Sequence, residues 1–189
     1  EGDFTMVYGF PGTTEQHVVS EYLKFIIEKE RPARIEMRNH SLAAIDAGMK
    51  ASDLTRIQYS AKQASIANAW KKWIGQVEGL ENLGAVKLKQ DYEAKYKAMA
   101  ISKPEWAKYA SALATLNGLM AEGTKTEYNY AIGVEYFSVG PEYFKLVRSL
   151  EDLLTNYAKY MANNELKGVL DKLQNTADGF FKNFDAAVD

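Results

Sequence analysis

Cysteine is absent from all 189 residues, which excludes disulfides and thiolate chemistry. This absence does not identify a compartment, because secreted bacterial proteins often lack cysteine too. An excess of charge is missing as well, since 23 basic and 25 acidic residues leave a net charge of −2. Without a basic block, the sequence does not favour nucleic acid or an anionic membrane surface as a partner. No apolar run approaches the ~18 residues that would span a bilayer.

Motifs for self-contained catalysis are also missing. The sequence has no G-x-S-x-G run, which would expose a nucleophilic serine on a tight turn. Both histidines, His17 and His40, fall on predicted helices. His17 and Glu21 are four residues apart, as two metal ligands on one helix can be, but no third ligand accompanies them. A solvated histidine is the commoner explanation. We therefore predict neither a metal nor another cofactor.

The segment that begins at Gly9, GFPGTT, precedes a predicted helix and resembles a phosphate-binding turn in outline. It lacks the lysine of the P-loop, and its glycine spacing differs. A turn followed by a helix cap explains the same residues. We therefore prefer that structural interpretation to a phosphate site.

The main feature present is Ser52–Leu80, the longest segment without proline. Its apolar residues recur mainly at intervals of three and four, which predicts a helix about 40 Å long. The residues of this pattern are Leu54, Ile57, Ala61, Ala64, Ala67, Trp70, Trp73, Ile74, Val77 and Leu80. We expect Ser52 to cap the helix and its apolar residues to face a core.

Asn68 stands out in this helix. It lies within the arc of roughly 80° that holds the first apolar residues, Leu54 to Ala64, before the apolar stripe turns toward Trp70 and Trp73. A buried asparagine can satisfy a helix end or fix the register of a helix. Its amide can also accept from a charged amine and donate to a carbonyl. The pattern alone leaves both roles open.

The remaining segments also predict helices, behind one short strand over Phe4–Gly9. Capping boxes at Thr13–Gln16, Ser102–Glu105 and Thr124–Glu127 each predict a helix start. We expect helices at 13–31, 32–50, 52–80, 85–99, 105–120, from 124, at 141–161 and from 166. Pro32 should separate the first two, and Glu93 should pair with Lys97. The sum is an all-α antiparallel bundle of about seven or eight helices with one short N-terminal strand.

The tyrosines at 128, 130, 136 and 143 form a group with two explanations. Tyrosine suits protein interfaces, but it is commoner at the wet edge of a helical core. The strand at the N-terminus, with no initiator methionine or signal peptide, suggests a piece of a longer protein.

Two stretches carry a family resemblance. MVYGFPGTT resembles the strand and turn of trypsin-like bacterial peptidases, in which an apolar strand ends in Gly-Tyr/Phe-Pro-Gly. Some sixty residues on, Thr55–Tyr59, Asn68-Ala-Trp-Lys71 and Ile74-Gly75 resemble the helical domain of serine-peptidase family forty-six, the bacterial dipeptidyl-peptidases 7 and 11. Ala69 departs from the family pattern, where an aromatic residue is frequent. This departure keeps Asn68 in register and puts the local packing in doubt.

The resemblance implies a parent enzyme that releases dipeptides from peptide N-termini. Such an enzyme has a trypsin-like double β-barrel with a Ser/His/Asp triad and a helical domain that covers the cleft. It is a homodimer of the periplasm or cell surface. By resemblance, residues 1–12 are a residual strand and turn of the barrel, and residues 13–189 are the helical cap. Asn68 would help to bind the α-amino group of the substrate, whereas no triad residue matches.

An exopeptidase that releases dipeptides must cut two residues from the charged amine at the N-terminus of its substrate. A fixed amide acceptor can set this distance, because an ammonium displaced from it would lose its hydrogen-bond partner. We therefore expect a cap that anchors peptides and gates entry but is inactive alone. The alternative is a stand-alone helical protein-interaction module, which would gain support if the segment FTMVYG packed on the helices. The preference for hydrophobic or acidic side chains at P1 cannot be read from this segment.

Overall fold

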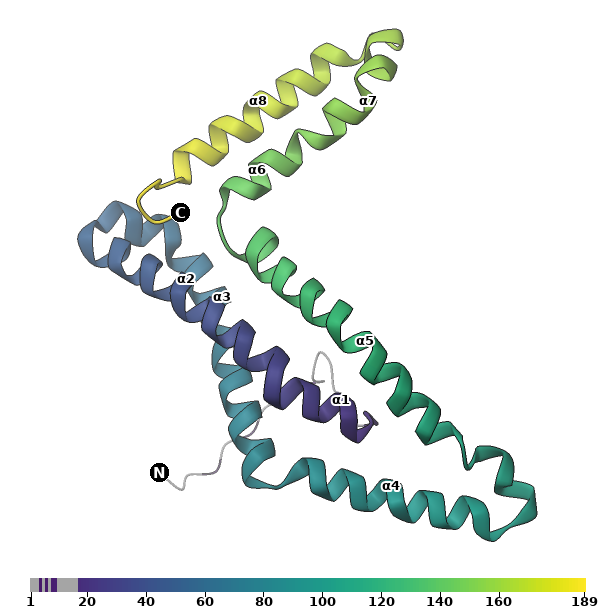
Figure 1. Cartoon of the computed structure of the whole chain (residues 1–189). Helices are drawn as coiled ribbons and strands as arrows, with labels where there is room; N and C mark the ends of the chain where they lie inside the picture. Colours follow the sequence, from purple (N-terminus) through teal and green to yellow (C-terminus); the bar gives the residue numbers. More distant parts are fainter. Residues whose placement is uncertain (1–3, 5, 7, 10–16) are drawn as a thin grey trace.

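The computed structural model describes residues 4, 6, 8, 9 and 17–189, whose regular secondary structure is all helical with no strand. Figure 1 shows their arrangement. In chain order, the elements are α1 (Ser20–Phe25), the π-turn η1 (Ile26–Glu30), α2 (Arg31–Ala51), α3 (Asp53–Asn82), α4 (Ala85–Ser102), the 3₁₀ helix η2 (Pro104–Tyr109), α5 (Ala112–Val134), the π-turn η3 (Glu135–Val139), α6 (Tyr143–Ser149), α7 (Glu151–Ala162) and α8 (Leu166–Asn183).

Several neighbouring elements are continuous, so the described residues form six long helical runs. The expected number of seven or eight helices is therefore not confirmed. Pro32 was expected to end a helix near Arg31, but α1, η1 and α2 run on as one rod. The N–H of Arg31 donates to the carbonyl of Ile26, five residues back, in the widened turn of η1. Because a proline ring clashes with the preceding turn and offers no N–H, a widened turn at this point lets the helix pass through.

Two other predicted helix starts are wrong. Ser102 ends α4, where its hydroxyl donates to the carbonyl of Met99, and only a 3₁₀ turn follows. Thr124 lies inside α5, and its hydroxyl donates to the carbonyl of Ala121. Serine and threonine have this alternative inside a helix, since their hydroxyls can bond to the backbone of the preceding turn.

The predicted N-terminal strand is not confirmed. Of that segment, Phe4, Met6, Tyr8 and Gly9 are described; they lie in no strand, and the first three are 90%, 72% and 96% exposed. The capping box at Thr13–Gln16 and most of the proposed phosphate turn lie outside the described residues. The rod begins at Ser20, so His17 is not helical. His17 and Glu21 therefore do not share a helix face.

The core lies between α2 and α3, which pack along most of their length. Leu42 and Ile45 of α2 meet Tyr59 and Ile66 of α3, and all four are buried. Helix α1 contacts both α4 and α5, which close a triangle with the α2–α3 pair in Figure 1. Every helix among the described residues is too short or too polar to cross a bilayer.

The sequence located α3 but misassigned its buried face. Ser52 caps the helix as predicted, because its hydroxyl accepts from the N–H of Thr55 at 3.3 Å. However, Leu54 and Ile57 are 65% and 71% exposed, and Ala61, Ala64 and Asn68 are exposed with them. The buried residues of α3 are Thr55, Tyr59, Ile66 and Trp73. The larger rings enter the core, where they fill more volume and bury more apolar surface than alanines can.

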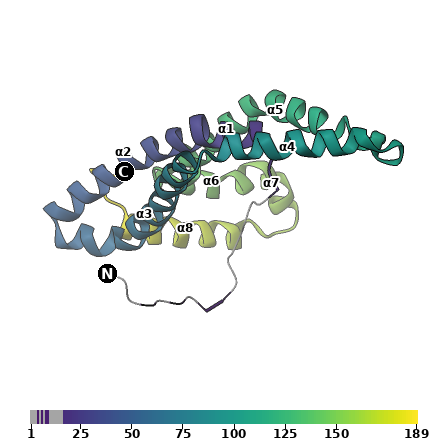
Figure 2. The same ribbon diagram turned by 90° about the horizontal axis from the view of Figure 1, so that it is seen from below.

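Helices α6, α7 and α8 form an arm, which lies below α1 and α2 in the view of Figure 2. The arm joins the rest of the molecule at residues 139–142 and through the segment after α8. In that segment, the side chain of Val188 packs against Gly48 of α2, where a β-carbon would collide with it. Several apolar side chains of α6 and α7 are exposed on this arm: Val147, Leu150, Leu154, Tyr157 and Met161.

Candidate functional site

Asn68 lies on the outward face of α3, at the middle of the helix. Its side chain is exposed and makes no hydrogen bond to another described residue. Along the same face, the residues one and two turns away are small or charged: Ala61, Ala64, Lys72 and Gly75 are all exposed. A ligand could therefore approach the amide of Asn68 closely, and both its donor and its acceptor are uncommitted.

The flanking turn of α3 is fixed to α2 by a polar contact. The indole N–H of Trp70 donates to the side-chain oxygen of Asn39 at 2.7 Å. The amide nitrogen of Asn39 in turn donates to Glu36 at 3.1 Å. The bond from Trp70 therefore links α3 to α2 at a position two residues from Asn68.

Behind Asn68, the buried side of α3 rests on three arginines of α2. Arg38 donates to the backbone carbonyl of Ile66 at 3.0 Å. The guanidinium groups of Arg31, Arg34 and Arg38 lie 5.2, 4.1 and 4.3 Å from the ring centre of Trp73. Cations over an indole face are attracted to its electron-rich surface, and this attraction strengthens when water is excluded.

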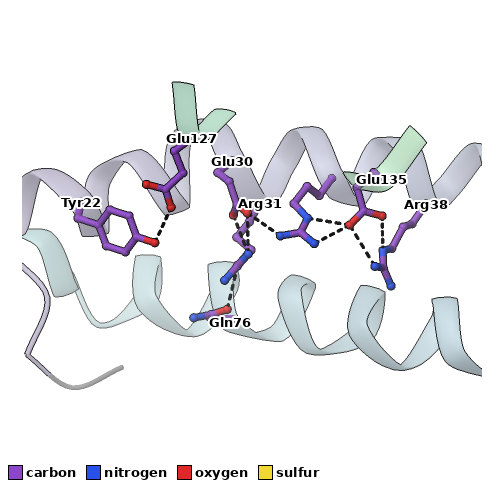
Figure 3. Close-up of polar contacts among 8 residues, drawn as sticks. Tyr22, Glu30, Arg31, Arg38, Gln76, Glu127 and Glu135 are labelled. Atoms are coloured by element: carbon purple, nitrogen blue, oxygen red, sulfur yellow. Dashed lines mark hydrogen bonds and ion pairs between the residues drawn. The ribbon is translucent and has the colours of Figure 1, made fainter. Parts of the chain in front are cut away.

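Two buried carboxylates balance these arginines (Figure 3). Glu135, whose side chain is 1% exposed, accepts from Arg34 and from Arg38 at 2.8 Å each. Glu30 accepts from Arg31 and Arg34 at 2.7 and 2.8 Å. Both glutamates lie in π-turns, Glu30 in η1 and Glu135 in η3. Glu30 is the last residue of η1 and Glu135 is the first residue of η3, so both carboxylates reach the arginines from the ends of widened helical turns.

Burial alone would lower the pKa of Arg34. Its hydrogen bonds to Glu30 and Glu135, together with their negative charges, outweigh that effect and raise the pKa above its ordinary value. The arginine is therefore charged at all working pH values, and the cluster is a fixed electrostatic support for α3.

The sequence did not indicate this cluster, although a signal was present. Arg31, Arg34 and Arg38 follow one another at intervals of three and four and so share one face of a helix. Three arginines on one face indicate a solvated surface unless the buried carboxylate of Glu135, about a hundred residues away, is known to meet them. The two carboxylates of the cluster, at positions 30 and 135, are separated by more than a hundred residues.

The other candidates from the sequence are not brought to Asn68. His40 is exposed on α2 and lies 3.3 Å from Glu36. In the part of the chain that the structure describes, no three acidic or histidine side chains gather as they would around a metal. Of the tyrosine group, Tyr130, Tyr136 and Tyr143 are exposed and Tyr128 is half-buried. Asn68 therefore lies on an exposed face of small and charged side chains, on a helix that α2 supports from behind.

The sequence profile of the family described as Peptidase S46 matches residues 1–189. The chain belongs to this family. The S46 chain is 35% identical over its whole length to an Asp/Glu-specific dipeptidyl-peptidase of Flavobacterium psychrophilum and 34% identical to one of Capnocytophaga gingivalis. It is 29% identical, again over its whole length, to a dipeptidyl-peptidase 7 of Phocaeicola vulgatus.

Each of these three relatives is much longer than the S46 chain, which spans 26% of their length. The resemblance inferred from the motifs at Gly9 and Asn68 is thereby confirmed. One of the two names of these relatives states a specificity for Asp and Glu, and the other, dipeptidyl-peptidase 7, states none. Family membership therefore does not assign a P1 preference to this chain.

Proposed function

We propose that the S46 chain is the helical cap of a serine-type dipeptidyl aminopeptidase and that Asn68 helps to anchor the α-amino group of the peptide substrate. The triad belongs to a trypsin-like barrel in the remainder of the polypeptide, and the cap alone is inactive. The parent enzyme acts as a homodimer in the periplasm or at the cell surface. The names of the relatives support the dipeptidyl-peptidase activity of the parent enzyme, and the other features are what the family resemblance implies.

The observation that carries the proposal is the state of Asn68. Its amide is exposed on a face of small side chains and is not used in the fold. A structural asparagine would be expected to be committed to a hydrogen bond within the fold, as Asn39 is to the indole N–H of Trp70. An uncommitted amide on a well-supported helix is instead suited to a ligand that is itself charged and must be held in one place.

The support behind Asn68 matters for an enzyme that measures substrate length. A small misplacement of a binding group can cost a large factor in rate, so the group must be held on a rigid element. On the opposite side of the same helix, Arg38 of α2 bonds to the carbonyl of Ile66 and lies over the ring of Trp73. The proposed gating would then move the cap as a unit and leave the local position of Asn68 on α3 unchanged.

The rival role, a stand-alone interaction module, would have gained support from an N-terminal segment packed on the helices. Phe4, Met6 and Tyr8 are instead almost fully exposed. Apolar side chains in that state are understandable if the segment continues into another part of a larger fold. This observation favours the cap.

Replacing Asn68 by alanine in the full-length peptidase tests the proposal. One lost hydrogen bond to a charged amine is worth about 1–3 kcal/mol, so kcat/KM for dipeptidyl substrates should fall roughly 5- to 150-fold. Steady-state kinetics with a dipeptidyl reporter measures the effect. Asn68→Asp, which keeps an acceptor for the ammonium, should retain more activity than Asn68→Ala.

Asn82→Ala is the matched control, because Asn82 is another exposed asparagine at the end of the same helix. It should leave kcat/KM unchanged. An unchanged kcat/KM in Asn68→Ala, or equal losses in both variants, would rule out the anchoring role.

A further inference from the structure

An apolar stripe without a partner runs along α6 and α7. Its six members are all large, and they are between 40% and 78% exposed: Tyr143, Val147, Leu150, Leu154, Tyr157 and Met161. The helical path is nearly continuous through Leu150, which donates to the carbonyl of Val147 and accepts from the N–H of Leu154, both at 3.1 Å. We refer to these six residues as the α6–α7 seam.

The spacing of the seam is that of a coiled coil. Its members follow one another at four, three, four, three and four residues, which keeps them on one narrow line of the helix. The half-buried residues Leu153, Asn156 and Tyr160 form a different side of α7, and this helix also contacts α8. The seam is therefore a second apolar side, additional to the one that already packs within the arm.

The exposed area is large for a surface without a partner. Six large side chains at these exposures present on the order of 700 Å² of surface, above the roughly 300–600 Å² of the largest apolar patch on a typical monomer. It approaches the about 800 Å² that each partner contributes to a standard interface. Burying it would stabilise the arm substantially, since apolar burial is the dominant favourable term in folding.

The period of the seam also restricts the shape of its partner. Residues that alternate at three and four fit the holes between the side chains of another helix, because both helices repeat with nearly the same period. A strand has a repeat of two and would meet only some of the six residues.

A charge beside the seam argues against antiparallel pairing with a second copy of the chain. The order of the spacings is the same from either end of the seam. Two copies could therefore pair in antiparallel fashion, with the centre of the pairing between Leu150 and Leu154. This pairing would bring the exposed carboxylate of Glu151 beside its own counterpart. Like charges at such flanking positions disfavour pairing, whereas a lysine or arginine on a different helix would favour it.

We propose that the α6–α7 seam is the docking site for an amphipathic helix from the part of the same polypeptide that lies outside residues 1–189. That helix carries apolar residues at coiled-coil spacing and a basic residue beside Glu151. The relatives are about four times as long as this chain, so a polypeptide of their length has ample sequence to supply it. The proposal does not depend on the role of Asn68.

The absence of cysteine from the chain allows a direct test. Leu154→Cys introduces a reporter at the most exposed seam position, and Lys159→Cys introduces one at an exposed position on the opposite side of α7. Each variant is labelled with a maleimide, both as the 189-residue chain and as the full-length peptidase, and the labelled peptide is quantified by mass spectrometry. Labelling at position 154 should be at least tenfold slower in the full-length protein, whereas labelling at position 159 should be equal in both.

Two results would overturn the proposal. One is equally rapid labelling of Leu154→Cys in both proteins. The other is protection in the 189-residue chain that grows with its concentration, which would identify a second copy as the occupant.

A photo-crosslinking residue at position 154 of the full-length protein then identifies what covers the seam. The expected crosslink is to a segment outside residues 1–189 with apolar residues at spacings of three and four and a nearby lysine or arginine. A crosslink to the seam of another copy, or to a segment with strand periodicity, contradicts the proposal.

Discussion

At the scale of single residues, Glu135 joins elements that are distant in sequence. Its carboxylate accepts hydrogen bonds from Arg34 and Arg38 of α2, and these arginines lie over Trp73 of α3. The two arginines are costly to bury unless their charge is matched. Glu30 compensates Arg34 in part, whereas Arg38 has Glu135 and the carbonyl of Ile66 as its hydrogen-bond partners. Glu135 of η3 therefore stabilises the α2–α3 contact through its ion pairs with two arginines of α2.

Replacing Glu135 by alanine should destabilise the chain by about 3–5 kcal/mol, because it leaves buried guanidinium groups without their counter-charge. Urea unfolding monitored by circular dichroism measures the change. Glu122→Ala is the matched control, since Glu122 is exposed on α5, in the same continuous helix. It should alter stability by no more than about 0.5 kcal/mol. A loss below about 1 kcal/mol for Glu135→Ala would show that water or a rearranged partner replaces the carboxylate.

Single residues also show what a sequence can and cannot assign. The motif Asn-Ala-Trp-Lys and a place among the apolar residues of α3 both indicate Asn68 as a candidate site residue. The motif led to the correct family, but the expectation that this line of apolar residues faces a core was wrong. Periodicity states that a helix has an apolar side. It does not state whether the partner of that side lies within the same segment, and here two apolar sides of one helix competed for one core.

At the scale of elements, the start of α1 depends on a distant carboxylate. The backbone N–H and the hydroxyl of Ser20 both donate to Glu93 of α4 at 2.7 Å. A carboxylate at this position satisfies an N–H that has no partner within the helix, and it complements the positive end of the helix dipole. The sequence predicted that Glu93 would instead pair with Lys97 on the same helix. The long-range contact was invisible to a pattern confined to α4.

Removing the carboxylate with Glu93→Ala should loosen the first turn of α1 and cost about 1–2 kcal/mol. Hydrogen exchange of the amides at 20–23 should accelerate, while α7 and α8 are unaffected. Lys97→Ala distinguishes the two explanations. If the pair within α4 carried the effect, both variants would behave alike; if the contact with Ser20 carries it, Lys97→Ala should leave exchange at α1 unchanged.

The elements that were predicted well are those determined by local sequence. Helix α3 begins at its predicted cap, and α2, α4 and α8 lie close to their expected ranges. The errors fall where tertiary contacts decide. Pro32 was read as a helix end, but the π-turn before it removes the clash. Ser102 and Thr124 were read as caps, but each hydroxyl bonds back to its own helix.

At the scale of the whole molecule, the arm of α6–α8 is held to α3 by a group of charges. The ammonium of Lys62 donates to the carbonyl of Gly140 at 2.7 Å and lies 2.9 Å from Glu142 and 3.5 Å from Asp189. Asp189 also accepts from the N–H groups of Glu142 and Tyr143, which begin α6. Thus one lysine connects the long helix, the start of the arm and the segment that follows α8.

This attachment should depend on pH. Burial would raise the pKa of Glu142, but hydrogen bonds from Lys145 and Lys62 outweigh it and hold the pKa below its ordinary value of 4.5. The hydrogen bond from Thr55 lowers the pKa of Asp185 in the same segment. A carboxyl whose pKa is lowered by folding stabilises the folded state above its ordinary pKa, and this contribution is lost as the pH falls through the lowered value. The arm should therefore loosen in acid, below about pH 4.

Lys62→Met keeps the length of the side chain but removes its charge, so the arm should already be loosened at pH 7. Small-angle scattering of the 189-residue chain should show a larger radius of gyration for the variant at pH 7, and a smaller further increase on acidification than in the parent chain. Helix content measured by circular dichroism should be unchanged at pH 7, because the helices of the arm pack on one another. Lys71→Met, an exposed lysine on the same helix, is the control and should scatter like the parent chain. If Lys62→Met also retains the parent radius at pH 7, the arm is held by the packing of Val188 against Gly48 and by the Asp189 cap of α6, and the lysine does not determine its position.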